Sequence, residues 1–269
     1  MQLPNLQALL EHVQPALMVT FRLGGLAVFA PVLASPLLPV RVRVLLVFML
    51  GLAVYPAMAG VVHPAATDGS LPSLAVAVAS EAAVGMLIGL VASLPLVAAQ
   101  TGGLVMGQQM GLGFARFYNP AIGEEADVLE QFLFLMLLAA FVAAGGIEAM
   151  VGAVLGSFER LPPGQAMIGL LVDRDLPGFL SGLLLSTLEL ALRVSAPLLA
   201  FVFLETVVLG FLAKTVPQLN VLSLGFPLRI VIGLGVIVIA LGPIGAALMD
   251  ETEAVFDGLA AFVEEGAHG

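Results

Sequence analysis

The chain has 269 residues, of which 60% are hydrophobic and 10% are charged, and its mean hydropathy is +1.11. Soluble domains have about 45–50% apolar and about 25% charged residues, so this composition excludes an ordinary soluble protein. The net charge of −10 and the lack of cysteine exclude a basic nucleic-acid binder, disulfides and thiolate metal sites. We predict an all-α integral membrane protein that forms one polytopic domain over residues 1–269.

Six hydrophobic segments follow one another along the chain. A helix needs about 20 apolar residues to cross a bilayer, and most of the segments approach or exceed that length. The fourth segment is interrupted by Gly145-Gly146, and the fifth is long enough to form one arm of a helical hairpin. We predict helices over segments 13–34, 44–62, 74–99, 131–158, 176–213 and 221–249.

The residues after the sixth segment form an acidic tail, 250–269, with six acidic residues and no lysine or arginine. Its apolar residues recur at helical spacing, at Val255, Leu259, Phe262 and Val263. This pattern predicts a short amphipathic helix. The negative charge also makes nucleic acid and anionic lipid unfavourable partners for the tail.

The most informative stretch is an uncharged run of 34 residues, Ala82–Ala115. It is too long for one simple span, and the five glycines between Gly102 and Gly113 weaken a helix where the run should leave the bilayer. Irregular backbone is tolerated at membrane depth only where protein buries it or it lines a water-filled cavity. We therefore predict a helix to about Ala99, followed from Met106 by an irregular, plug-like element beside a passage.

Five charged residues lie inside the hydrophobic segments, where a charge is costly unless it faces protein or water. They are Arg22, Glu81, Glu189, Arg193 and Glu205. Glu189 and Arg193 are four residues apart, so we predict an ion pair along one helix face in preference to an ion pathway. Glu81 and Glu205 have no partner nearby in the sequence. We expect them, and Arg22, to meet charges of another subunit, and proton relay is the alternative for the two carboxylates.

No residue pattern indicates catalysis. The three histidines, His12, His63 and His268, lie far apart, and no pair has the spacing of metal ligands. Asp173 and Asp175 fit a solvated loop better than a metal-binding pair, because no other acidic residue is placed to help. The sequence contains neither a nucleophile elbow nor a phosphate-binding loop. We predict a non-enzymatic protein with no catalytic residue, cofactor or metal.

Two blocks of sequence go beyond composition. Met106–Pro120 reads MGQQMGLGFARFYNP, and Leu209–Ile230 reads LGFLAKTVPQLNVLSLGFPLRI. By these blocks, their spacing, the PVRVR motif at Pro39–Arg43 and the hydrophobic profile, the chain resembles the FliR/SctT family of type III export-apparatus membrane proteins. The resemblance covers essentially the whole chain. The LGFPLR motif at Leu224–Arg229 resembles the flagellar branch more than the virulence branch.

The resemblance implies that the loop after the third segment plugs a closed pore. On this sequence the plug loop spans residues 106–122. Glycines permit tight turns, and methionines suit a reversible apolar seal. The plug residues carried over are Met106, Gly107, Gln108, Gln109, Met110, Gly111, Leu112, Gly113, Phe114, Arg116, Phe117, Tyr118, Asn119 and Pro120.

The resemblance also implies a division of the chain into a FliP-like part (residues 1–175), a FliQ-like helical hairpin (176–249) and the tail. A proline in the hairpin turn would end the helix, and the amide side chains after it would supply local hydrogen bonds. The turn and partner-contact residues are Lys214, Pro217, Gln218, Leu219, Asn220, Gly225, Phe226, Pro227 and Arg229.

As a member of this family, the chain would act as a subunit of a conical, multi-subunit export gate. Its partners would be FliP-like and FliQ-like gate subunits, an FlhB-like switch subunit, membrane lipid, and unfolded flagellar proteins in transit, but not nucleic acid. It would lie as a multi-pass protein in the bacterial inner membrane, within the flagellar basal body.

Two alternatives to a flagellar gate subunit stay open. The first is the virulence counterpart, SctT. The second, from a different class, is a self-contained secondary transporter with Glu81, Glu189 and Glu205 as coupling carboxylates. Transporters commonly have corresponding broken helices in two halves, and only one glycine-rich break occurs here, which counts against the second alternative.

Overall fold

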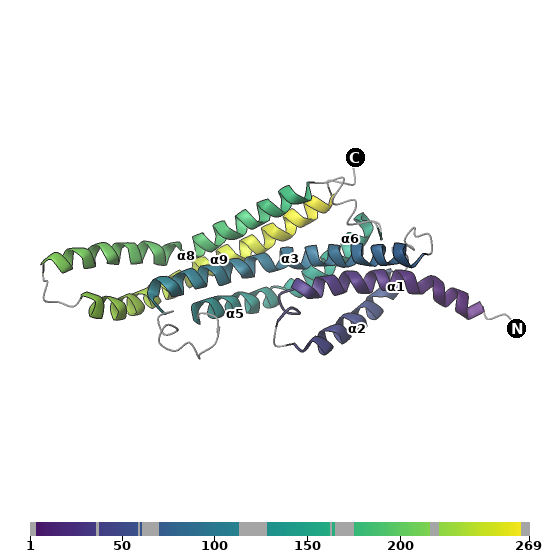
Figure 1. Ribbon diagram of the computed structural model, residues 1–269, viewed down its shortest axis with the longest axis horizontal. Helices are drawn as coiled ribbons and strands as arrows, with labels where there is room; N and C mark the ends of the chain where they lie inside the picture. Colours follow the sequence, from purple (N-terminus) through teal and green to yellow (C-terminus); the bar gives the residue numbers. More distant parts are fainter. Residues whose placement is uncertain are drawn as a thin grey trace. The chain divides into compact units, whose positions relative to one another are not determined.

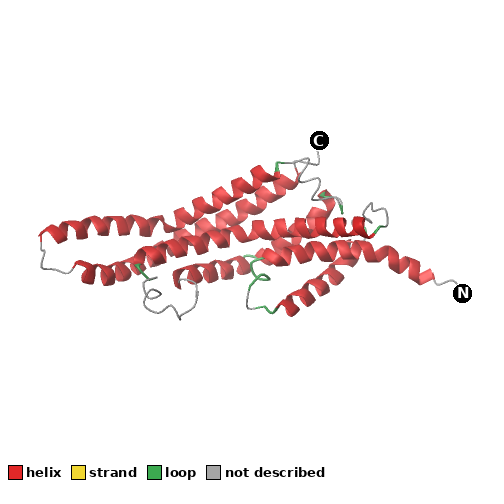
Figure 2. Cartoon of the chain, viewed as in Figure 1, coloured by secondary structure: helices red, strands yellow, loops and turns green. Residues whose placement is uncertain are grey.

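The computed structural model describes residues 4–35, 38–58, 60, 70–112, 128–161, 163–164, 175–215 and 221–264. Over this part the regular structure is helical, without strands, which confirms the all-α prediction (Figures 1 and 2). The helices are α1 (Pro4–Phe29), α2 (Val40–Met58), α3 (Leu71–Met110), α5 (Val128–Ala143), α6 (Gly146–Arg160), α8 (Leu176–Thr215) and α9 (Val221–Glu264).

Four of the described helices are long and apolar enough to cross a membrane. They are α2, α3, α8 and the part of α9 from Gly225 to Phe262, and the bent pair α5–α6 can count as a fifth span. The predicted fourth segment is divided between α5 and α6 at Gly145, whose φ of 81° lies in the left-handed region that glycine adopts readily. The six predicted segments thus correspond to α1, α2, α3, α5 with α6, α8 and α9.

The acidic tail is not a separate helix, because α9 continues through Pro243 and past Met249 to Glu264. The predicted boundary after the sixth segment is therefore wrong. The helix continues because no glycine or proline lies at the junction of Met249 and Asp250. The predicted apolar face is confirmed where side chains are described: Val255 and Leu259 are buried, and Phe262 stacks on Phe179 with ring centroids 4.1 Å apart.

Two compact units make up the chain. The first unit contains Met1–Leu94, Val142–Leu183 and Glu253–Gly269, and the second contains Pro95–Phe141 and Leu184–Thr252. Helices α3, α8 and α9 each contribute residues to both units. The division into FliP-like and FliQ-like parts concerns likeness to other subunits and stays a prediction.

In the first unit, α1 and α3 approach each other closely at glycines. A Cβ atom on Gly85 would collide with the carbonyl oxygen of Arg22, and one on Gly25 would collide with that of Ala82. One turn along α3, a Cβ on Gly89 would lie 2.6 Å from the carbonyl oxygen of Leu26. Small residues let two helix backbones come this near, so the crossing of α1 and α3 requires glycine.

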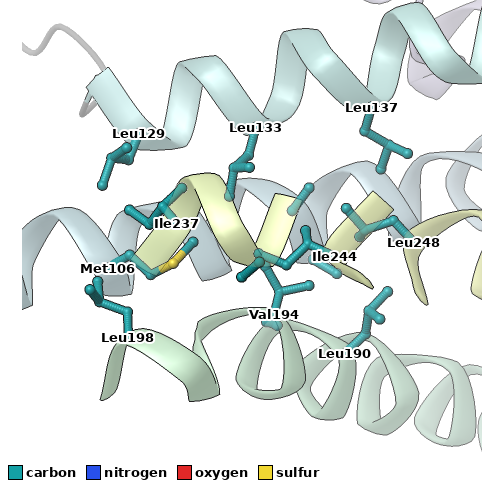
Figure 3. Packing of buried hydrophobic residues seen from close by; sticks show 14 of the residues in the cluster. Met106, Leu129, Leu133, Leu137, Leu190, Val194, Leu198, Ile237, Ile244 and Leu248 are labelled. Atoms are coloured by element: carbon teal, nitrogen blue, oxygen red, sulfur yellow. The ribbon is translucent and has the colours of Figure 1, made fainter. Parts of the chain in front are cut away.

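In the second unit, an apolar core gathers side chains from α3, α5, α8 and α9. Figure 3 shows them pointing toward one another, with Met106 from α3, Leu133 from α5, Val194 from α8 and Ile244 from α9 among the labelled residues. Leu133 and Leu198 have no exposed surface. The core therefore holds the last turns of α3 against three other helices.

Helix α3 passes through the glycines that were expected to weaken it, so the predicted end near residue 99 is wrong. The reason is packing: a Cβ on Gly103 would lie 2.7 Å from the carbonyl oxygen of Leu129, and one on Gly102 would lie 3.0 Å from Cγ1 of Val194. These glycines allow α5 and α8 to come close. Tertiary packing here outweighs the low helix propensity of glycine, which costs about 1 kcal/mol per residue.

Candidate functional site

The structure describes the predicted plug only as far as Leu112. Met106–Met110 belong to α3, so a loop at this place begins no earlier than Gly111. Met106 and Met110 are buried in the core of the second unit, whereas Gln108 and Gln109 are exposed. The remaining plug residues lie outside the described part: Gly113, Phe114, Arg116, Phe117, Tyr118, Asn119 and Pro120.

The end of α3 has a defined hydrogen-bonding pattern. Gly111 has φ of 79°, its N–H donates to the carbonyl of Gln108 at 3.1 Å, and the N–H of Leu112 donates to the carbonyl of Gly107 at 3.0 Å. This pair of bonds with a left-handed glycine is the Schellman motif. Leu112 packs against the core of the second unit, so the chain leaves α3 in a fixed direction.

A second feature lies beside this helix end. The Arg229 Nε donates to Oε2 of Glu205 at 2.6 Å, and its Nη2 donates to Oγ1 of Thr206 at 3.3 Å. The Arg229 Nη1 donates to the carbonyl oxygen of Gln109 at 3.3 Å. One guanidinium on α9 therefore reaches two neighbouring residues of α8 and the last turn of α3. We call Arg229, Glu205, Thr206 and Gln109 the α3-end cluster.

The α3-end cluster corrects one expectation. Glu205 was expected to meet an arginine of another subunit, and its partner is Arg229 of the same chain. The Glu205 side chain is 4% exposed, and the Arg229 side chain is 22% exposed. The second carboxylate oxygen of Glu205, Oε1, is buried and has no hydrogen-bond partner within the described part of the chain.

In the first unit, Arg22 and Glu81 form a fully buried ion pair. The Arg22 Nε donates to Oε2 of Glu81 at 2.6 Å, and neither side chain has exposed surface. The Arg22 Nη1 donates to Oγ of Ser157 at 2.8 Å. The N–H of Gly164 donates to the other carboxylate oxygen of Glu81 at 2.7 Å. The expectation that these two charges meet another subunit is wrong, because each finds its partner within the chain.

Further contacts stabilise the two buried charges of this ion pair. The Arg22 guanidinium also lies over the ring of Phe158, 3.8 Å from its centroid, and its Nη2 is 3.5 Å from the carbonyl oxygen of Leu161. Buried ions are tolerated when good geometry and further hydrogen bonds offset the loss of water. Each oxygen of the Glu81 carboxylate receives a hydrogen bond, so the pair is a structural joint between α1, α3, α6 and the turn after α6.

The predicted pair of Glu189 and Arg193 is present on α8. The atoms are 3.3 Å apart, and the side chains are 69% and 64% exposed. An exposed pair at this spacing contributes only about 0.3–0.5 kcal/mol. The pairs of Arg22 with Glu81 and of Arg229 with Glu205 are far less exposed than this one.

The predicted hairpin turn is described only at its two sides. Lys214 lies in the last turn of α8, and Gly225, Phe226 and Pro227 lie in the first turns of α9. A Cβ on Gly225 would lie 3.0 Å from Cδ1 of Leu209, which places α9 close to α8 at this end. Pro217, Gln218, Leu219 and Asn220 lie outside the described residues.

Among the residues that the structure describes, no three His, Cys, Asp or Glu side chains lie close enough together to hold a metal ion. His12 pairs with the hydroxyl of Tyr55 at 2.7 Å, and Asp175 accepts the N–H of Gly178 at the start of α8. His63, His268 and Asp173 lie outside the described part.

Sequence reasoning missed the joint between Arg22 and Glu81, although two signals pointed to it. The first is charge: one segment held a lone cation and another a lone anion. The second is the spacing of Gly85 and Gly89, a small-xxx-small pattern that marks a close helix contact in membranes. Together they would have placed α1 against α3.

Comparison with known proteins gives a family match over most of the chain. The model of the family described as "Bacterial export proteins, family 1" matches residues 13–255. The flagellar biosynthetic protein FliR of Escherichia coli (strain K12) is 28% identical over 88% of this chain and 87% of its own length.

Two further relatives cover less of the chain. The FliR protein of Bacillus subtilis (strain 168) is 29% identical over 61% of this chain, which spans 63% of that relative's length. The Yop proteins translocation protein T of Yersinia pestis is 28% identical over 75% of this chain and 76% of its own length.

Proposed function

Because the chain belongs to the bacterial export proteins, family 1, and is thus a membrane component of type III export, we propose that it is a non-enzymatic subunit of the flagellar export gate. The family match over residues 13–255 carries this proposal. In the proposed complex the chain completes a pore with FliP-like and FliQ-like subunits and contacts an FlhB-like switch subunit. The complex lies in the bacterial inner membrane and passes unfolded flagellar proteins.

Exposed apolar surface on the second unit supports a subunit role. On α8, Phe203 is 73% and Phe211 is 72% exposed, and on α9 Ile239 is 82% exposed. Side chains of this size are rarely left in water in such numbers, so lipid or neighbouring subunits must cover them. Their position on the predicted FliQ-like hairpin fits a surface for FliQ-like neighbours.

The buried carboxylates argue against a self-contained transporter. Glu81 and Glu205 are each paired with an arginine at 2.6 Å, and Glu189 lies in an exposed pair. A coupling carboxylate must exchange its ion or proton with water during transport, whereas the Glu81 side chain has no exposed surface and that of Glu205 is 4% exposed. The virulence counterpart remains an alternative because of the Yersinia pestis relative.

Purification with the proposed partners tests the gate proposal. We expect the chain, expressed with FliP-like and FliQ-like proteins of the same bacterium, to purify as a stable complex, since that complex would cover its exposed apolar helices. Expressed alone, it should aggregate or be degraded. A stable solitary protein that couples ion flux to substrate movement would contradict the proposal. Complementation distinguishes the flagellar from the virulence role: a flagellar subunit should restore motility, and not virulence secretion, to a bacterium that lacks this chain.

The plug proposal predicts a leak. Deletion of residues 111–118 should leave the complex assembled but make the membrane permeable to small solutes, because the segment that closes the pore is lost. Solute efflux from vesicles that contain the purified complex measures the effect. A second deletion, 113–118, keeps the Schellman motif at the end of α3 and separates loss of the plug from fraying of the helix.

A deletion of similar length between α2 and α3, within residues 61–69, serves as the control and should not leak. Wild-type permeability of both plug deletions in an assembled complex would refute the assignment of the plug, while the gate proposal would still rest on co-purification.

A further inference from the structure

The α3-end cluster lies where the proposed plug begins. The last carbonyl groups of a helix have no partner within the helix, and each needs a donor from elsewhere. The Schellman motif takes up the carbonyls of Gly107 and Gln108. The next carbonyl, that of Gln109, accepts from Arg229, which is 120 residues further along the chain. A side chain of α9 therefore completes the end of α3.

Arg229 is itself held firmly. It bonds Glu205 at 2.6 Å and Thr206 at 3.3 Å, so all three of its nitrogens have acceptors. A positive charge beside the carboxyl end of α3 also interacts favourably with the helix dipole. Loss of this side chain would free both the Gln109 carbonyl and the buried Glu205 carboxylate.

One turn further along α9, apolar packing joins the same two elements. Gly233 lies four residues after Arg229, on the same face of the helix. A Cβ on Gly233 would lie 3.2 Å from Cε of Met110, and Met110 has no exposed surface. Residues 109 and 110 of α3 are thus fixed by residues 229 and 233 of α9, the first by hydrogen bonding and the second by packing.

We propose that Arg229, held by Glu205, is the positioning residue of the plug. It attaches the last turn of α3 to the pair α8 and α9, so that the chain after Leu112 starts from a point set by that pair. A shift of α9 against α8 then changes where the plug begins. This inference rests on the proposed plug function and adds to it the element that controls the plug.

Replacement of Arg229 by methionine tests the inference. Arg229→Met introduces an unbranched apolar side chain and removes the three donor nitrogens of the guanidinium. In the assembled complex we expect efflux of small solutes from vesicles to rise roughly tenfold, since charge-assisted hydrogen bonds of this kind shift a two-state balance by such a factor or more. Arg193→Met removes an arginine from an exposed pair on α8 and should leave efflux unchanged.

A reversible disulfide between α3 and α9 distinguishes a loss of plug positioning from a general loss of protein stability. The chain has no cysteine, so Met110→Cys with Gly233→Cys introduces a single disulfide. The Cγ atom of Met110 lies 3.3 Å from the Cβ position of residue 233, which suits a disulfide. In the Arg229→Met background, oxidation should restore closure of the pore, and reduction should restore the leak.

The outcomes distinguish this inference from the plug proposal. If the 113–118 deletion leaks and an assembled Arg229→Met complex does not, the positioning role is wrong and the plug proposal stands. If neither leaks, the plug proposal fails as well. A leak that formation of the disulfide does not reverse also overturns the positioning role. If Arg229→Met does not assemble, Arg229→Lys replaces it, because lysine keeps the charge beside Glu205 but cannot serve three acceptors in fixed directions.

Discussion

Glu81→Ala is expected to destabilise the first unit by about 3–5 kcal/mol, because it leaves the Arg22 guanidinium buried without a counter-ion. The substitution also removes the acceptor of the Gly164 N–H. Such a loss is a large fraction of the stability of a typical domain, about 5–15 kcal/mol, so the variant should accumulate poorly in membranes. Denaturant unfolding of the purified complex in detergent micelles measures the loss.

Glu189→Ala provides the matched control. It removes a glutamate that also pairs with an arginine, but the pair is exposed, so the change should stay within about 0.5 kcal/mol. A combined Arg22→Met and Glu81→Leu variant should recover much of the loss, because an apolar pair of similar volume can replace a buried ion pair. Equal stability of Glu81→Ala and Glu189→Ala would contradict this account.

Gly85→Ala is expected to destabilise the first unit by about 1–3 kcal/mol or more, although alanine favours helices. The added methyl group would collide with the backbone carbonyl oxygen of Arg22, and a backbone atom cannot turn aside as a flexible side chain can. Helices α1 and α3 would have to separate, which would also strain the ion pair of Arg22 and Glu81. The same unfolding assay measures the effect.

Gly152→Ala, in α6 of the same unit, should have the opposite effect on stability. Nothing lies within 4 Å of a Cβ added there, and the residue is exposed. Alanine should therefore stabilise the helix by about 0.5–1 kcal/mol. If both alanine variants stabilise the protein, α1 and α3 do not cross as closely as described.

The helices could be predicted from the sequence because long apolar runs in a membrane protein have few alternatives to helix. The six segments match described helices, and the break at Gly145 was visible in the sequence. The end of α3 was missed because glycine propensity is a local property, whereas Gly102 and Gly103 are held in helix by close packing against α8 and α5.

Spacing along the chain alone predicted the pairing of charges only within one helix. Glu189 and Arg193 are four residues apart, so helical geometry alone brings them together. Arg22 and Glu81 are 59 residues apart, and their meeting depends on how α1 crosses α3. Spacing along the chain contains no information on that crossing, apart from the glycine pattern of α3. The later plug residues and the hairpin turn lie outside the described residues and stay predictions.

The continuity of α9 changes what can be removed from the carboxyl end. By sequence, residues 250–269 form a separate acidic tail, and a truncation after Met249 would be a natural choice for expression or for attaching a tag. In the structure the buried side chains of Val255 and Leu259 belong to this segment of the first unit, and the half-buried Phe262 stacks on Phe179 at the start of α8. The shortest chain that keeps this packing therefore extends at least through Phe262.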